Sequence, residues 1–462
     1  MNALFWQGNS LKLLGKTIFK LSLLRSHIVY KVLGVPFFAR KSSIAELIYQ
    51  IKQNEDFDTR ELDKKIEFLV VESCKVKFSK TVRKNRIIYL ASELYEDGGH
   101  TKCLREYASV LSEDFLQAVF LTRYTSTKIK NKSTLDVISK NANIYGNELN
   151  LYNWKKQIIT LYNEICEYSP KVIFVFIHPN DIYGAMLLAL IKKYTNIGIV
   201  YYPHASHYPN LGMNFSDLSL HNLPSTAKIT REIRKFSKTH VFGLVSKRIS
   251  DFPNITAQQI SEQKKIFGIN PNEVCVMAGG AAYKFFDADG TSKFFQTVKK
   301  IMELRPNVRV VIMANFNSEQ ISWIGNVFSS PELRTRLILT KTTPAYELNF
   351  SCADVFLDSF PVSAALTMVD LMRLKVPYVV KINRQNPFWS FHEYQKEDYP
   401  YMFEEIDDFI VGALKLIDNE SERRRIVKMN YEFYLSKYEG NAGRLRLCQL
   451  INNYQKLSCY ID

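Results

Sequence analysis

A lysine that follows two glycines marks the first stretch of this sequence with the means to bind an anion. In Met277–Asp289 (MAGGAAYKFFDAD), a short apolar run ends at Gly279 and Gly280, and Lys284 follows. Glycine has no Cβ, so a ligand can approach the backbone there, and a lysine ammonium can pair with a diphosphate. The spacing does not match a Walker phosphate loop. The competing interpretation is an ordinary strand-to-helix turn with a solvated lysine.

A second stretch with the same potential is Ala353–Leu371 (ADVFLDSFPVSAALTMVDL). Its apolar start predicts a strand at 355–357, and Ser363 is placed to cap a helix after the turn. That helix would carry Thr367 and Asp370. A helix N-terminus at the carboxyl end of a parallel strand attracts anions through its free N–H groups and its dipole. Asp370 lies too deep in the helix to meet a phosphate, so we expect it to face a ribose.

His100 is the candidate general base. It follows Gly99 in a glycine loop just after the first predicted strand of the main body, 86–92. Histidine titrates near neutral pH, so it can take a proton from a hydroxyl group held beside it. The alternative is that His100 is only a polar residue at the start of the next helix.

Two further histidines, His204 and His207, lie in the run YYPHASHYP. With His178 they could bind a metal ion, but no cysteine is near and the spacing is loose, so we favour contact with a substrate. Asp287 and Asp289 form an Asp-x-Asp pattern, which some sugar-transferring enzymes use to hold a divalent cation. We favour a capping role at the following helix instead, and no metal or cofactor is expected.

Two series of apolar strands alternating with helices must position these residues. The first runs from the strand at 86–92 to a strand at 197–202, and a loop-like segment follows at 203–238. The second runs from a helix at 258–267 to a strand at 378–381. Such alternation is typical of parallel sheets covered on both faces. Three helices close the chain, at 404–418, 420–435 and 442–457.

The first 45 residues are basic and amphipathic. They contain seven lysines and arginines and no acidic residue, in a chain of net charge +15. Leucines, isoleucine and phenylalanine between positions 11 and 24 alternate with these charges in a pattern that predicts an interfacial helix, too interrupted for a transmembrane span. An anionic membrane surface is the expected partner, ahead of simple docking on the protein body. Residues 43–77 are expected to form a small helical appendage.

Length and cysteine usage limit the remaining possibilities. A chain of 462 residues with 46% hydrophobic content exceeds the size of one core, which favours two major domains. Its seven cysteines are scattered without a close pair, so neither a zinc site nor a disulfide framework is indicated and a reducing cytoplasm fits. The basic charge could serve nucleic-acid binding, but it is concentrated at the N-terminus and no nucleic-acid-binding motif accompanies it, so we expect no such partner.

Three segments together carry a family resemblance. These are MAGGAAYKFF (277–286), PNVRVVIMAN (306–315) and RLILTKTTPAYELNFSCADVFLDSFPVSAALTMVDLMRLKVPYVV (336–380). In order and spacing they resemble the nucleotide-sugar domain of the O-linked N-acetylglucosamine transferases and of the bacterial adhesin N-glucosyltransferases. The likeness covers 274–381, with fainter echoes at 202–206 and around His100. It implies an α/β GT-B fold, with two facing Rossmann-like domains, an N-terminal basic helical region and C-terminal helices. We place the boundaries at 1–82, 83–245 and 246–462.

The resemblance also implies roles for single residues. Lys284 matches the lysine that neutralises a UDP diphosphate, and Thr367 matches a threonine near the phosphates. Asp370 matches the aspartate that binds the ribose, and His100 falls beside the acceptor. The chain departs from the family at Ala364–Leu366 and at Met368, where fewer hydroxyl groups remain for the phosphates. It also lacks tetratricopeptide repeats.

The expected function is an inverting, metal-independent transfer of a sugar from a nucleoside-diphosphate sugar to a bacterial envelope glycan or glycolipid acceptor. We expect it to act in the cytoplasm, at the inner face of the cytoplasmic membrane. Transfer to protein and nucleotide-sugar epimerisation are the enzymatic alternatives. A nucleic-acid-binding protein and a catalytically silent scaffold are the others, since a fold alone does not fix activity.

Overall fold

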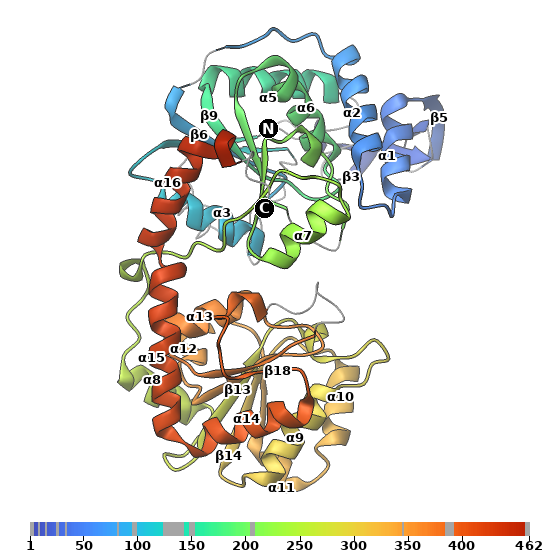
Figure 1. Cartoon of the computed structure of the whole chain (residues 1–462). Helices are drawn as coiled ribbons and strands as arrows, with labels where there is room; N and C mark the ends of the chain where they lie inside the picture. The colour runs from blue at the N-terminus through green and yellow to red at the C-terminus, as the bar shows by residue number, and fades with distance from the viewer. Residues whose placement is uncertain are drawn as a thin grey trace. The chain divides into compact units, whose positions relative to one another are not determined.

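A computed structural model of the chain (Figure 1) shows two compact units. It describes residues 4–7, 10–13, 16–24, 27–32, 35–80, 83–94, 99–122, 143–146, 153–203, 208–343, 346–383 and 392–457. The first unit comprises Met1–Lys247 together with Gly443–Asp462, and the second comprises Arg248–Ala442.

The N-terminal residues form a sheet, so the predicted interfacial helix is wrong. Five antiparallel strands pair in sequence order: β1 (Leu4–Gln7), β2 (Ser10–Leu13), β3 (Lys16–Leu24), β4 (His27–Val32) and β5 (Val35–Lys41). Glycines, which weaken a helix, occur at positions 8, 15 and 34. The segments 16–33 and 35–41 contain many β-branched and aromatic residues, such as Ile18, Phe19 and Val29, which favour strands.

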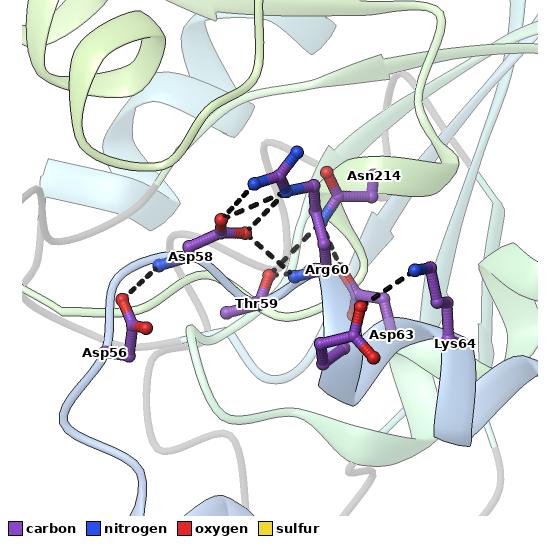
Figure 2. A network of polar contacts seen from close by, with 8 residues as sticks. Asp56, Asp58, Thr59, Arg60, Asp63, Lys64 and Asn214 are labelled. Carbon is purple, nitrogen blue, oxygen red and sulfur yellow. Dashed lines mark hydrogen bonds and ion pairs between the residues drawn. The ribbon is translucent and has the colours of Figure 1, made fainter.

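The predicted helical appendage is confirmed as α1 (Ser43–Gln53) and α2 (Arg60–Ser73). A buried aspartate on α2, Asp63, ties it to the turn at η1 (Met213–Phe215), because its carboxylate accepts hydrogen bonds from Gly212 N, Asn214 Nδ2 and Thr59 Oγ1 (Figure 2). The appendage is therefore part of the first unit's core rather than a separate module.

The main sheet of the first unit is parallel, as predicted. Its order is β12-β11-β10-β9-β6-β7-β8. The strands are β6 (Arg83–Ala91), β7 (Leu116–Leu121), β8 (Asn143–Gly146), β9 (Pro170–Phe176), β10 (Gly198–Tyr201), β11 (Leu218–His221) and β12 (Thr239–Val241).

Helices cover both faces of this sheet (Figure 1). Alternate strand residues such as Ile173 and Val175 share one core with α1, α2, α5 (Trp154–Tyr168) and α6 (Ile182–Tyr194). On the other face, Tyr107 of α3 (Gly99–Val110) packs edge-on against Phe174 and Phe176. The loop predicted at 203–238 is wrong in its second half, which holds β11 and α7 (Pro224–Glu232). A four-residue strand is too short to show a period in the sequence.

The second unit has a parallel sheet of order β15-β14-β13-β16-β17-β18. Its strands are β13 (Val274–Gly279), β14 (Val308–Met313), β15 (Leu337–Thr340), β16 (Val355–Leu357), β17 (Tyr378–Lys381) and β18 (Met402–Phe403). Its helices are α8 (Ala257–Ile266), α9 (Lys293–Leu304), α10 (Ser318–Val327), α11 (Pro331–Arg336), α12 (Tyr346–Phe350), α13 (Leu366–Leu374), α14 (Ile406–Asp418) and α15 (Glu420–Lys437), with short turns at η2 (Ile249–Asp251), η3 (Ala282–Phe285) and η4 (His392–Tyr394).

The last helix, α16 (Gly440–Leu457), starts in the second unit and continues into the first. There the Arg444 guanidinium forms a two-pronged ion pair with the Asp114 carboxylate, at 2.6 and 2.7 Å. Tyr454 covers Gly198 of β10 so closely that a Cβ at that position would lie 2.3 Å from the tyrosine ring. The final residues thus differ from the predicted domain division, which placed the whole of 246–462 in one domain. Among the described helices, none combines the length and apolar character needed to cross a membrane.

Candidate functional site

The two stretches predicted to bind an anion come together in the second unit. β13 and β16 are adjacent and parallel, with Val276 opposite Val355 and Met277 opposite Phe356. Their carboxyl ends therefore lie at the same edge of the sheet. There the Lys284 ammonium, on η3 after β13, donates a hydrogen bond of 2.9 Å to the Ser363 carbonyl in the turn after β16.

The two glycines before Lys284 are both required by close contacts. A Cβ on Gly279 would lie 2.6 Å from the Phe350 ring of α12. Gly280 adopts φ +156°, and a Cβ there would lie 3.3 Å from Lys284 Cδ. Its N–H donates to the Met313 carbonyl at the end of β14. The bare backbone thus leaves room for the Lys284 side chain to lie along the strand ends.

The turn after β16 is organised by a carboxylate that the sequence analysis missed. Asp358 is fully buried, and its Oδ1 accepts hydrogen bonds from Ser363 Oγ (3.0 Å) and Ala364 N (2.8 Å). Burial raises the pKa of Asp358 to about 7, against the lowering effects of these bonds and of the Lys284 charge. Burial also lowers the pKa of Lys284, and the negative charge of Asp358 opposes that shift.

Ser363 does not cap the helix, which corrects the sequence prediction. The helix α13 begins at Leu366, and its N-cap is Ala365, whose φ of +52° and ψ of −111° are unusual for a residue with a Cβ. The Ser363 hydroxyl is instead directed to Asp358, because a buried carboxylate needs hydrogen-bond donors more than an accessible helix end does. Ser363 Oγ also accepts a bond from Ala365 N at 3.3 Å.

Thr367 and Asp370 lie on α13, as predicted. Thr367 is half-buried in the first turn, and its N–H donates to the Ala364 carbonyl at 3.2 Å. Asp370 is buried one turn further on, where the Tyr346 hydroxyl of α12 donates to its Oδ2 at 3.3 Å. Tyr346 was missed as a site residue, since nothing in the sequence links it to a carboxylate 24 positions away.

The Asp-x-Asp pattern has a local structural role. Asp289 Oδ1 accepts hydrogen bonds from the Thr291 N–H and hydroxyl, and the helix α9 is capped by Ser292, whose Oγ accepts from Phe295 N. The predicted capping role therefore belongs to Ser292, three residues after Asp289. Across the part of the chain that the structure describes, no three His, Cys, Asp or Glu side chains gather as a metal-binding group.

His100 lies at the carboxyl edge of the first unit's sheet. It follows Gly99 in the first turn of α3, is buried, and packs edge-on against Phe176 with 5.4 Å between ring centroids. Phe176 in turn stacks on Tyr202, just after β10, at 5.0 Å. The two predicted substrate-contacting histidines, His204 and His207, lie outside the described residues.

A second buried carboxylate organises this edge and was also missed. Asp181 caps α6 by accepting a bond from Gly184 N, and its Oδ2 accepts from the hydroxyls of Ser92 and Thr122. Ser92 follows β6 and Thr122 follows β7, and Ser92 Oγ also accepts from His178 N after β9. One aspartate thus holds the ends of three strands beside His100.

Comparison with known proteins identifies the fold. No family model matches the chain, and no curated protein matches it in sequence. Among solved structures, HepE from Anabaena, in complex with UDP and glucose, aligns at a TM-score of 0.60 and 11% identity, over 80% of this chain and 99% of that one. The chain has the GT-B fold.

Other structural neighbours are enzymes with different activities. A mutant O-GlcNAc transferase from Thermobaculum terrenum covers 90% of this chain and 78% of its own at a TM-score of 0.56 and 12% identity. The lipopolysaccharide outer core galactosyltransferase WaaB covers 80% and 99% at a TM-score of 0.56 and 13% identity. The predicted fold is confirmed, and an O-GlcNAc transferase is among the neighbours, as the sequence resemblance implied.

Proposed function

We propose that this GT-B protein is a glycosyltransferase that uses a nucleoside-diphosphate sugar, with UDP as the nucleotide. The observation that carries the proposal is the pairing of Lys284 with the turn at Ser363–Ala365, at the carboxyl edge of the second unit's sheet. Lys284 is the cation for the diphosphate, and the positive end of the α13 dipole favours the same anion. Asp370, buried beside this turn, is the acceptor for the ribose hydroxyls. Neighbours solved with UDP support the choice of nucleotide.

The chemistry proposed is an inverting transfer that needs no metal ion. An acceptor hydroxyl attacks the anomeric carbon of the sugar, the bond to the diphosphate breaks, and a nucleoside diphosphate leaves. The negative charge that grows on the leaving group is stabilised by Lys284 and by the positive end of the α13 dipole. His100 takes the proton of the attacking hydroxyl, which its place at the carboxyl edge of the first unit's sheet supports.

The proposed acceptor is a bacterial envelope glycan of the capsule or lipopolysaccharide type, and the proposed location is the inner face of the cytoplasmic membrane. Neighbours such as WaaB support the acceptor class. The first 45 residues support membrane attachment, since seven basic and no acidic residues suit an anionic surface whether they lie on a helix or on strands. A variant with Lys12, Lys16 and Lys20 replaced by glutamine should bind anionic vesicles less than the wild type. Equal sedimentation of both proteins with anionic vesicles would refute this attachment.

The donor site is tested by calorimetric titration with UDP. We expect Lys284→Ala and Asp370→Ala each to weaken UDP binding by about tenfold or more, because each removes a charge-assisted contact. Lys300→Ala is the matched control, since Lys300 is an exposed lysine of the same unit that pairs with Asp407 and should leave UDP binding unchanged. Wild-type affinity in both site variants would refute the assignment.

Nucleotide-sugar epimerisation is the second candidate. A putative UDP-N-acetylglucosamine 2-epimerase from Listeria monocytogenes aligns over 80% of this chain and 97% of its own at a TM-score of 0.52 and 13% identity. The two functions separate when the protein is incubated with a UDP-sugar and no acceptor. An epimerase converts the sugar under these conditions, whereas a transferase leaves it unchanged apart from slow hydrolysis.

A further inference from the structure

Asp358 is the most deeply buried charged side chain of the donor turn, although it has no direct place in the chemistry proposed above. It follows β16 directly and is fully shielded from solvent. Its Oδ1 holds Ser363 Oγ and Ala364 N, and the carbonyl of that same Ser363 holds the Lys284 ammonium. Ser363 therefore links the two charged groups, since its hydroxyl bonds to the Asp358 carboxylate and its carbonyl bonds to the lysine.

The other end of the same strand shows what an ordinary structural aspartate does here. Asp354 precedes β16, accepts a bond from Cys275 N at 2.8 Å, and forms an ion pair with Lys264 while its side chain stays 29% exposed. Asp358 has neither solvent nor a directly bonded lysine or arginine among the described residues. Burying a carboxylate in such a place costs free energy unless its hydrogen bonds offset the loss of solvation.

The charged and titratable groups around Asp358 come from two elements besides its own. Lys284 on η3 and the N–H of Lys381 on β17 both favour the ionised carboxylate. Tyr378 of β17 is buried nearby; burial raises the pKa of its hydroxyl, and the negative charge of Asp358 adds to that shift. The Asp358 carboxylate thus interacts mainly with the turn at Ser363–Ala365 and with the charge of Lys284.

Ala365 gives a second and independent sign that this turn is held in place. Its φ of +52° is strained for a residue with a Cβ, and such a conformation persists only where the neighbouring contacts fix it. The contacts that fix it are the bonds from Ala364 N to Asp358 and from Ala365 N to Ser363 Oγ.

We propose that Asp358 is a positioning residue of the donor site, which fixes the turn at Ser363–Ala365 so that Lys284 and the start of α13 are arranged for a diphosphate before it binds. This role presupposes the donor site proposed above. Its effect passes through the acceptor geometry of Oδ1, so an asparagine, which keeps an acceptor oxygen there, should preserve most of it. Preorganisation of this kind improves affinity by removing the cost of ordering the turn on binding.

The test compares UDP affinity and thermal stability in Asp358→Ala, Asp358→Asn and the control Asp354→Ala. We expect Asp358→Ala to weaken UDP binding about tenfold, and Asp358→Asn to restore affinity to within about threefold of the wild type. Asp354→Ala should lower the melting temperature and leave the UDP affinity unchanged. If Asp358 had only a structural role, Asp358→Ala would behave in the same way as Asp354→Ala. If Asp358→Ala does not fold, Ser363→Ala removes the same contact from the other side and should weaken UDP binding several-fold.

Several results would overturn the role of Asp358. Wild-type affinity in Asp358→Ala or in Ser363→Ala would do so, as would an asparagine variant as weak as the alanine variant. Equal loss of affinity in Asp354→Ala would show that general destabilisation explains the effect. If the wild-type protein binds neither UDP nor other nucleoside diphosphates, the donor site itself is refuted. If the wild type binds UDP and the Asp358 variants bind it equally well, only the role of Asp358 is refuted.

Discussion

The stability of the first unit should depend on pH through Asp63, which joins the helical appendage to the body (Figure 2). This side chain is 1% exposed and accepts hydrogen bonds from Thr59 Oγ1 (3.1 Å), Asn214 Nδ2 (2.6 Å) and Gly212 N (2.8 Å). Burial raises the pKa of Asp63 from 3.8 to about 6, although these bonds lower it. The perturbation we choose is Asp63→Asn, which removes the titration and keeps the shape.

The sign and size follow from the two pKa values. A carboxyl whose pKa is higher in the folded state than in the unfolded state binds more protons when folded, so stability falls as pH rises between the two values. Over the whole window a shift of this size costs about 3 kcal/mol, with about 1.4 kcal/mol of it falling between about pH 5 and about pH 7.5. The wild type should therefore gain about 1.4 kcal/mol relative to Asp63→Asn when the pH is lowered over that interval.

The assay is urea denaturation of both proteins at about pH 5 and about pH 7.5, followed by circular dichroism. Loss of hydrogen bonding in the asparagine variant affects both pH values alike, so it drops out of the comparison. Asp58→Asn is the control, because a hydrogen bond from Arg60 lowers the pKa of the Asp58 carboxyl, so Asp58 is ionised at both pH values and its replacement should leave the pH dependence unchanged. Parallel pH dependences in the wild type and Asp63→Asn would refute the reasoning.

Three further predictions concern close packing and backbone strain. Gly279→Ala places a Cβ 2.6 Å from the Phe350 ring and should destabilise the second unit by about 1–3 kcal/mol, which Phe350→Leu should partly restore in a thermal melt. Gly198→Ala places a Cβ 2.3 Å from the Tyr454 ring and should destabilise the first unit by a similar amount, about 1–3 kcal/mol, with recovery in the double variant Gly198→Ala/Tyr454→Leu. Ala365→Gly relieves a φ of +52° and should raise stability by about 1 kcal/mol; a lower melting temperature would show that the turn is unstrained.

The sequence predicted the long buried strands well and the short or exposed ones poorly. Strands such as β9, with five consecutive buried apolar residues at 172–176, are recognisable because a fully buried parallel strand is largely apolar. β11 has four residues, so it offers no period to detect. The basic N-terminus forms strands although its charges suit helical spacing, because its β-branched and aromatic residues favour strands.

The candidate site was predicted where chemistry follows from local sequence, and missed where it follows from tertiary contact. Lys284 and the turn at Ser363 could each be found from the local sequence, and they meet because they follow adjacent parallel strands that end at one edge of the sheet. Asp358 and Asp181 were overlooked because their importance depends on donors that the fold brings to them from elsewhere. The role of Ser363 was misassigned for the same reason.

The return of α16 to the first unit has a consequence for how the chain folds during synthesis. The contacts of Arg444 with Asp114 and of Tyr454 with Gly198 join residues separated by more than half of the chain. A ribosome that has completed the first unit's sheet still has the whole second unit to translate before these partners emerge. The first unit should therefore remain open along the surface that α16 covers until residues 443–457 have left the exit tunnel. During that interval Asp114 and the face of β10 around Gly198 are available to chaperones.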